Sequence, residues 1–139
     1  MLVLSLNINM GGKCSFSDIE KGDWCEQYIA SAVNAGITYG TGNGKFGRGD
    51  SVTRQDIAVM TVRALEFIGY NFEKAEDYMD MDSTSDYAVS AMRKLFGEKV
   101  MVGDGQGFLS PADNATRAET AKIITDIMMK GGTFDAEID

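Results

Sequence analysis

Two four-residue stretches place an arginine inside a pattern that starts helices. They are Thr53-Arg54-Gln55-Asp56 and Thr116-Arg117-Ala118-Glu119, and the second follows the first by 63 residues. In each stretch the threonine hydroxyl can accept the amide proton of the residue three positions on. The acidic side chain of that residue can reach back to the threonine amide. The sequence therefore predicts that Thr53 with Asp56, and Thr116 with Glu119, cap two helices.

Helix capping does not explain the two arginines. A cation in the first helical turn lies at the positive end of the helix dipole, which costs roughly a few tenths of a kcal/mol. Free amides at a helix start and a fixed guanidinium together form a site for an anion. An ordinary surface arginine is the alternative for either copy alone, but the shared register favours the anion site. Arg54 and Arg117 are therefore candidate residues for binding a carboxylate.

The composition limits the classes of function. The chain has 139 residues, 44% of them hydrophobic, which suffices for one core shared by small units. Its 13 basic and 21 acidic residues give a formal charge of −8, which argues against a nucleic-acid-binding surface. Histidine, the usual ligand of transition metals, does not occur, so neither a metal site nor a cofactor is predicted. No apolar run approaches the length of a membrane span, and residues 1–10 lack the basic region of a signal peptide.

The spacing of 63 residues extends well beyond the arginine stretches. Trp24 is matched by Tyr87, and three alternating glycines recur in each half, Gly40, Gly42 and Gly44 and then Gly103, Gly105 and Gly107. Such glycines permit positive φ and a close approach of the backbone to a ligand or another segment. The expected division is an N-terminal segment (1–15), repeat one (16–70), a linker (71–78), repeat two (79–130) and a tail (131–139).

The two cysteines, Cys14 and Cys25, allow either one disulfide that closes a small loop or two free thiols. Two cysteines are too few for a metal framework. Free thiols are favoured, because the position of Cys25 is taken by Ala88 in the second repeat, as expected for a small packed residue.

Each repeat predicts two helices separated by the glycine-rich loop. The first helix of repeat one carries apolar residues at helical spacing, namely Trp24, Tyr28, Ile29, Ala32 and Val33. The capped helices should each bury one face, formed by Ile57, Met60, Thr61, Ala64, Leu65 and Ile68 in repeat one and by Ala121, Ile124, Ile127 and Met128 in repeat two. The predicted fold class is all-α, with tandem helix-loop-helix repeats packed around a shared helical bundle.

The two ends of the chain alternate between apolar and polar residues. Leu4, Leu6, Ile8 and Met10 alternate with polar residues, which predicts a short strand. The alternative is that these residues finish a helix left over from a preceding, truncated repeat. The tail alternates in the same way over residues 134–138, so the two ends could pair with each other or belong to a neighbouring module.

These motifs, in this order and spacing, resemble the S-layer homology (SLH) module. The resemblance rests on Phe16-x-Asp18, Trp24, the loop from Gly40 to Phe46 and the arginine stretch, most of which recur in repeat two. It covers roughly residues 16–130. Membership of this family implies helical modules, usually three around a pseudo-threefold bundle. It also implies that they hold bacterial surface proteins non-covalently on secondary cell-wall polysaccharide, often through a pyruvate ketal.

The resemblance implies an extracellular, non-enzymatic module at the cell wall or S-layer, with candidate glycan contacts in both repeats. Repeat two departs from the pattern, because Tyr87 replaces the tryptophan and the leading aspartate could be Asp80 or Asp82. For Trp24, core packing is favoured over sugar contact, and for Asp18, capping is favoured over ligand contact. The implied glycan-binding residues are Arg54, Arg117, Asp18, Trp24, Tyr87, Gly40, Gly42, Gly44, Gly103, Gly105 and Gly107.

Two other functions stay open from the sequence. A protein–protein assembly module at the cell surface would use the arginines and loops for subunit contacts, its glycan site having decayed. A glycoside hydrolase has the least support, because no pattern places two carboxylates across a cleft. Two repeats also leave an apolar edge that a third would cover, which predicts self-association, a missing third repeat or coverage by the terminal segments.

Overall fold

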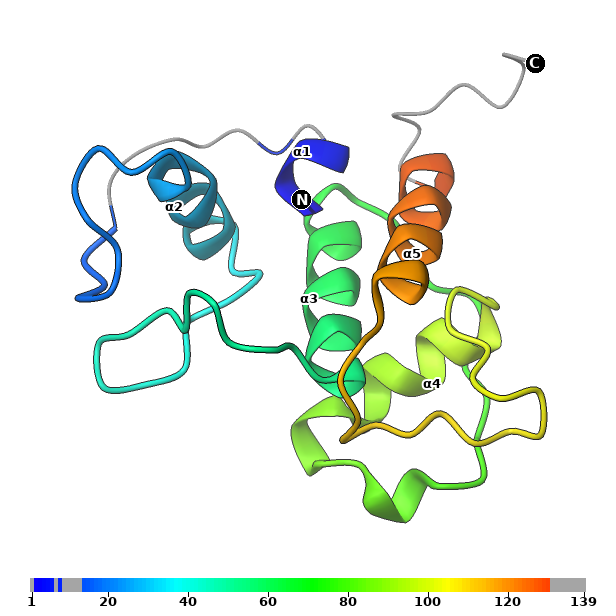
Figure 1. Ribbon diagram of the computed structural model, residues 1–139. Helices are drawn as coiled ribbons and strands as arrows, with labels where there is room; N and C mark the ends of the chain where they lie inside the picture. Colours follow the sequence, from blue (N-terminus) through cyan, green and yellow to red (C-terminus); the bar gives the residue numbers. More distant parts are fainter. Residues whose placement is uncertain (1, 7, 9–13, 131–139) are drawn as a thin grey trace.

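The computed structural model describes residues 2–6, 8 and 14–130 of the chain, and this part consists of helices and loops without a β-sheet (Figure 1). The predicted all-α class is therefore confirmed. Two short 3-10 turns, η1 and η2, precede the first helix of repeat two. The elements are α1 (Leu2–Ser5), α2 (Glu26–Asn34), α3 (Arg54–Phe67), η1 (Met81–Ser83), η2 (Asp86–Ala88), α4 (Val89–Gly97) and α5 (Arg117–Lys130).

The capped helices α3 and α5 form the centre of the molecule and both begin at its lower end in Figure 1. Helix α4 packs against α3, whereas α2 lies to one side and contacts α1. The main core joins residues of α1, α3, α4 and α5, among them Leu65, Met92 and Ile127. A smaller cluster of Ile19, Cys25 and Ile29 lies under α2. The chain thus has one large core and a less well packed flank.

The buried faces of the capped helices differ in part from the prediction. In α3, Ile57 and Met60 are only half-buried because they line a cavity described below, while Val59 and Val62 are buried. In α5, the predicted Ala121 is exposed and Ile123 is buried in its place. Helix α5 turns a narrow face inward, so two isoleucines one helical turn apart are enough to cover it.

The first helices begin later than predicted. Trp24 precedes α2 and is 74% exposed, and its counterpart Tyr87 lies in η2 and is 59% exposed. The adjacent small residues Cys25 and Ala88 are buried instead. Core packing was favoured for Trp24, and this expectation is wrong, because the buried position belongs to the residue that follows it. Cys14 and Cys25 are free thiols.

The N-terminal segment is helical where the sequence predicted a strand. Val3, Leu6 and Ile8 are buried, whereas Leu4 is exposed, so strict alternation fails. Helix α1 contacts α2, α3 and α5, and this apolar environment favours a helical turn over an unpaired strand. The predicted role of the terminal segment in covering the apolar edge is thus met in part. Met10 and the predicted strand of the tail lie outside the described residues.

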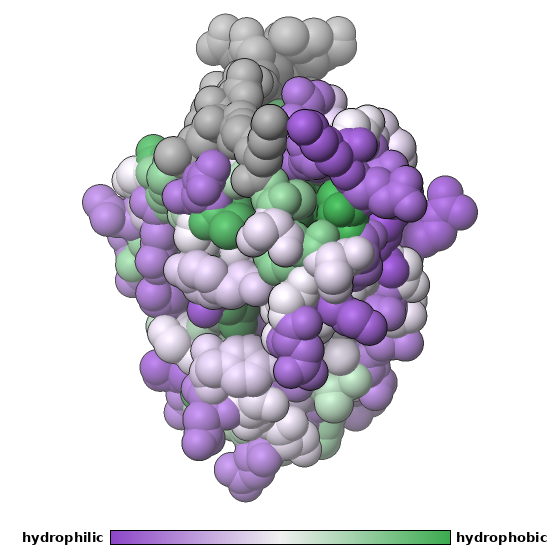
Figure 2. Space-filling view, turned by 90° about the vertical axis from the view of Figure 1, so that its left-hand side faces the viewer, coloured by the Kyte–Doolittle hydropathy of each residue, from purple (hydrophilic) through white to green (hydrophobic). Residues whose placement is uncertain are grey.

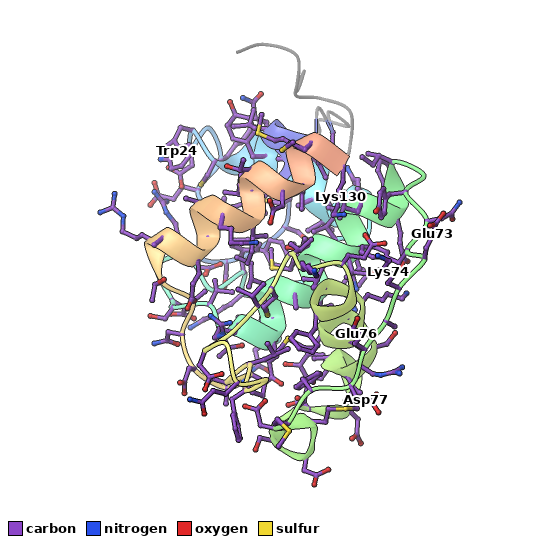
Figure 3. All side chains as sticks on the ribbon, turned by 90° about the vertical axis from the view of Figure 1, so that its right-hand side faces the viewer. Trp24, Glu73, Lys74, Glu76, Asp77 and Lys130 are labelled. Atoms are coloured by element: carbon purple, nitrogen blue, oxygen red, sulfur yellow. The ribbon has the colours of Figure 1, made fainter. Side chains whose placement is uncertain are left out.

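The acidic linker is packed along α4. The amide of Glu76 donates to the carbonyl of Arg93 at 3.0 Å, and Tyr78 is buried in the core. Figure 3 shows Glu73, Lys74, Glu76 and Asp77 following one another down this side of the molecule. A Cβ atom at Gly97 would lie 2.8 Å from the backbone nitrogen of Ala75, so glycine permits this close contact.

We expect Gly97→Ala to destabilise the protein by about 1–3 kcal/mol, because the added methyl group meets rigid backbone instead of a flexible side chain. Urea unfolding measures the difference. Ser90→Ala, on the exposed side of the same helix, serves as the control and should change the free energy of unfolding by less than about 0.5 kcal/mol. Equal effects of the two substitutions would contradict the close packing of the linker.

Candidate functional site

Asp18 organises the glycine-rich loop of repeat one. Its carboxylate accepts hydrogen bonds from the amides of Phe46 (2.8 Å), Gly47 (2.9 Å) and Arg48 (3.1 Å). The bond from the Phe46 amide is the main cause that lowers the pKa of Asp18, and the bonds from the next two amides add to it. The expected helix cap is therefore not what Asp18 forms. It fixes the exit of the loop, because a carboxylate can satisfy several amides that point to one place.

Asp80 does the same in repeat two. Its carboxylate accepts from the amides of Leu109 (2.9 Å) and Ser110 (2.8 Å), while Asp82 is exposed. The alternative left open by the sequence is thereby resolved in favour of Asp80. Both glycine-rich loops are held by an aspartate that lies 28 to 30 residues before the amides it accepts from.

All six loop glycines have positive φ, between 66° and 100°. A Cβ atom at Gly40 would lie 2.5 Å from the carbonyl oxygen of Lys45, and one at Gly107 would lie 2.9 Å from Met79 Cγ. Gly103 likewise has the backbone of Phe108 beside it. At these glycines the close approach is to the chain itself. Gly42, Gly44 and Gly105 have open space where a side chain would be.

The two capping patterns are used differently. In the second, Thr116 Oγ1 accepts from the amide of Glu119 at 3.1 Å and Glu119 Oε2 accepts from the amide of Thr116 at 3.0 Å, which is a complete capping box. In the first, Thr53 Oγ1 accepts from the amide of Asp56 at 3.2 Å. The carboxylate of Asp56 accepts instead from the Tyr87 hydroxyl at 2.5 Å, a contact between the repeats.

Arg54 is buried between the repeats, with 7% of its surface exposed. Its Nε donates to the carbonyl of Leu109 at 2.5 Å, and its Nη1 forms an ion pair with Glu119. The amides at the start of α3 are also taken, because those of residues 54 and 55 donate to the carbonyls of Asp113 (2.8 Å) and Pro111 (2.9 Å). The predicted anion position of repeat one therefore holds a loop and a carboxylate of repeat two.

Arg117 occupies the equivalent position at the start of α5 and is exposed. Within residues 14–130 and the described N-terminal residues, no hydrogen bond or ion pair involves its guanidinium. The neighbouring Glu119 is held in the capping box and by Arg54, so it does not neutralise Arg117. Two arginines with the same local sequence thus have opposite environments.

The two exposed aromatic residues occupy equivalent positions in front of the first helices. Trp24 projects from the surface, as Figure 3 shows. The bond to Asp56, followed by partial burial, raises the pKa of Tyr87. An exposed ring held in this way offers an apolar face of the kind that stacks on sugar rings.

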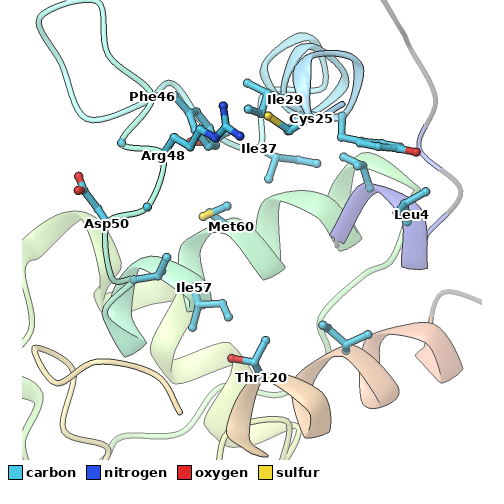
Figure 4. Close-up of a pocket in the computed structure, with 18 of the residues that line it drawn as sticks. Leu4, Cys25, Ile29, Ile37, Phe46, Arg48, Asp50, Ile57, Met60 and Thr120 are labelled. Carbon is cyan, nitrogen blue, oxygen red and sulfur yellow. The ribbon is translucent and has the colours of Figure 1, made fainter. Parts of the chain in front are cut away.

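A cavity of about 460 Å³ lies between α2 and the central helices, and the sequence gave no indication of it. It is mainly apolar and opens on the side of the molecule seen in Figure 2, where apolar residues gather between polar ones. Figure 4 shows residues of α2 and α3 on opposite walls. Its lining includes Trp24, Ile29, Phe46, Met60 and Ile123.

A polar cluster that the sequence analysis also missed joins the ends of α4 and α5. Tyr70 Oη donates to Glu98 Oε2 at 2.5 Å, and Lys130 Nζ lies 3.1 Å from the same carboxylate oxygen. Burial alone would raise the pKa of Glu98, but the bonds from Tyr70 and Lys130 outweigh it and the pKa is lowered. Burial and the bond to Glu98 raise the pKa of Tyr70, and the same bond raises that of Lys130 against its burial. The three groups were not predicted because each is distant from the others in sequence.

We expect Glu98→Gln to destabilise the protein by about 2 kcal/mol at neutral pH, because it removes charged hydrogen bonds from a buried acceptor. A lowered folded-state pKa gives stability that is present above the unfolded value of 4.5 and lost as the pH falls through the folded value. The difference between wild type and variant should therefore shrink below about pH 4.5. The contributions of Tyr70 and Lys130 are present below about pH 10 and lost above it.

Unfolding curves at several pH values test this, with the exposed Glu76→Gln as the control. A difference that stays constant down to about pH 3 would show that Glu98 is not held as the carboxylate.

Comparison with known proteins gives a family and several relatives. The model of the S-layer homology domain matches residues 15–58 and 77–121. An endoglucanase of Bacillus sp. (strain KSM-635) is 30% identical over 97% of this chain and 15% of its own length. An amylopullulanase of Thermoanaerobacterium thermosulfurigenes is 35% identical over 86% of this chain and 6% of its own length. The S-layer protein sap of Bacillus anthracis is 29% identical over 99% of this chain and 16% of its own length.

The chain therefore spans less than a fifth of each of these relatives, and what it shares with them is the pair of S-layer homology domains. The catalytic names of two relatives refer to proteins that are mostly outside the matched part. Among the described residues, no helix has the length and apolar character needed to cross a bilayer.

Proposed function

Because the chain belongs to the S-layer homology family, whose domains are cell-surface anchoring modules of S-layer proteins and surface enzymes, we propose that it binds a pyruvylated secondary cell-wall polysaccharide. It acts without catalysis, outside the cell, at the wall or S-layer. A pyruvate ketal presents one carboxylate on a rigid sugar ring, and a guanidinium can hold such a carboxylate through two parallel hydrogen bonds.

The observation that carries this proposal is the exposed Arg117, which lacks a partner among the described residues and stands on a fixed capping box. Its position at a helix start adds the positive end of a dipole to the guanidinium charge. Arg54, predicted for the same role, is reassigned to holding the two repeats together. The proposed contact for the glycan carboxylate is therefore Arg117 alone.

The remaining contacts of the proposed site come from the exposed aromatics and the open parts of the loops. Trp24 and Tyr87 can cover apolar faces of sugar rings. Gly42, Gly44 and Gly105 leave backbone accessible to a ligand, whereas Gly40, Gly103 and Gly107 shape the loops. Asp18 supports its loop from behind. The signature acids are engaged with Arg54 and Tyr87, which supports binding without catalysis.

Sedimentation with purified cell wall tests the proposal. We expect the chain to sediment with native wall and to stay in solution with wall from which the secondary polysaccharide has been extracted. Equal binding to both preparations would contradict the proposal. That result would favour the assembly-module alternative, in which protein loops take the place of the glycan, as the loop of repeat two does at Arg54.

A further inference from the structure

Repeat two shows how a first helix and its loop hold a capped helix. The inner face of η2 and α4 packs against α3 and is fully buried by it. Ser85 and Tyr87 add hydrogen bonds to the first turn of α3 through Gln55 and Asp56. The residues of this inner face, all no more than 7% exposed, are Ala88, Ala91, Met92, Leu95 and Val100.

The same positions in repeat one face the cavity. Counting back 63 residues from each member of that inner face gives residues that all line the space between α2 and the central helices. Figure 4 shows Cys25, Ile29 and Ile37 pointing into it. The complete set is Cys25, Tyr28, Ile29, Ala32 and Ile37. Repeat one thus presents a helix-holding face to a cavity of about 460 Å³.

The loop that holds the start of α3 has its counterpart at the same cavity. In repeat two, the carbonyls of Leu109, Pro111 and Asp113 accept from Arg54 and from the first amides of α3. The residues 63 positions earlier, Phe46, Arg48 and Asp50, are all part of the cavity lining. Both parts of the holding surface are therefore repeated at this cavity.

Helix α1 closes the cavity at the end where α3 ends in the other repeat. Ile8 donates its amide to the carbonyl of Val3 at 2.7 Å, and Tyr70 donates to Leu65 at 3.0 Å, the same bond across five residues. The offset between these pairs is 62 residues, as between Asp18 and Asp80. Val3 lines the cavity, so α1 corresponds to the last turn of a helix like α3.

We propose that this cavity is the seat of an amphipathic helix that is continuous with α1 and equivalent to α3. It has about twelve residues ahead of and including Val3, a length of about 18 Å. It presents small and aliphatic side chains, as α3 presents Ala58, Val59 and Val62 to its own surroundings, and it begins next to Asp50. The occupant is thus a capped helix of a further repeat, and this inference is independent of the glycan site.

A chain extended in register tests this proposal. Residues Thr53–Ala64 are copied directly ahead of Val3, in place of the first two residues, so that Val3 takes the position of Leu65. We expect the melting temperature to rise by about 5 °C or more. We also expect the amides of α2 to exchange with solvent more slowly, since the helix they flank gains a packed partner.

Two matched controls share the added length. In one, two alanines separate the copy from Val3, which turns its apolar face by about 200°. In the other, the copied Val59 and Val62 are replaced by aspartate. Neither should raise the melting temperature. The proposal is wrong if the in-register chain is no more stable than these controls.

Two further measurements identify other occupants, and either positive result overturns the proposal. Light scattering on the unextended chain detects a second copy on this face, if Ile29→Asp dissociates an oligomer and the extension brings no stability. Saturable binding of an uncharged apolar dye, unchanged in the extended chain, would identify a pocket for a small ligand. A synthetic peptide of residues 53–65, added in trans, should stabilise the unextended chain if the extended one fails to fold.

Discussion

Arg54→Ala is expected to destabilise the protein by about 3 kcal/mol. The substitution removes a buried cation, leaves the carbonyl of Leu109 without its donor and leaves a void between the repeats. The loss lies at the lower end of the range for broken buried pairs, because the side chain of Glu119 is 38% exposed and can be hydrated. Urea unfolding followed by circular dichroism measures it.

Arg54→Lys is the informative companion variant. It keeps the positive charge but lacks the fork of donors that serves both Leu109 and Glu119. We expect it to recover less than half of the lost stability. Wild-type stability for either variant would contradict the assignment of Arg54 to the contact between the repeats.

Arg117→Ala is expected to weaken binding to native wall by about ten- to a hundredfold, which corresponds to the loss of one charge-assisted pair of hydrogen bonds. The free energy of unfolding should change by less than about 0.5 kcal/mol, because the side chain is exposed and unpartnered among the described residues. The same signature position therefore separates binding from stability, with Arg117 serving the first and Arg54 the second.

Arg117→Lys retains the charge and tests the geometry of the contact. Lysine offers a single ammonium group instead of a planar fork, so partial binding is expected. Lys122→Ala, on the same helix, controls for a general loss of positive charge. If Lys122→Ala weakens wall binding as much as Arg117→Ala, then charge alone accounts for the effect and Arg117 has no special role.

Local pattern was sufficient for much of the fold. The capping boxes, the helical spacing and the glycine loops depend on residues a few positions apart, so each could be read from the sequence. The capping threonines do accept the expected amides at the starts of α3 and α5. The internal repeat then placed these elements in order, although not relative to one another.

The contrast between Arg54 and Arg117 lay beyond the sequence. Both occur in the same local pattern, and only the loop of repeat two, more than 50 residues from Arg54, makes one of them structural. Trp24 was misassigned for a similar reason, since helical spacing cannot tell which of two adjacent residues points inward. In α1, four residues of helix depend on neighbouring helices that no local pattern reveals.

The most direct test of the proposed function is a calorimetric titration of the intact chain with a pyruvylated cell-wall oligosaccharide and with the same oligosaccharide after removal of the ketal. We expect saturable binding of the pyruvylated form, at least about tenfold weaker binding of the other, and a loss of this difference in Arg117→Ala. Equal affinity of the wild-type chain for the two oligosaccharides would show that the carboxylate is not what this module recognises.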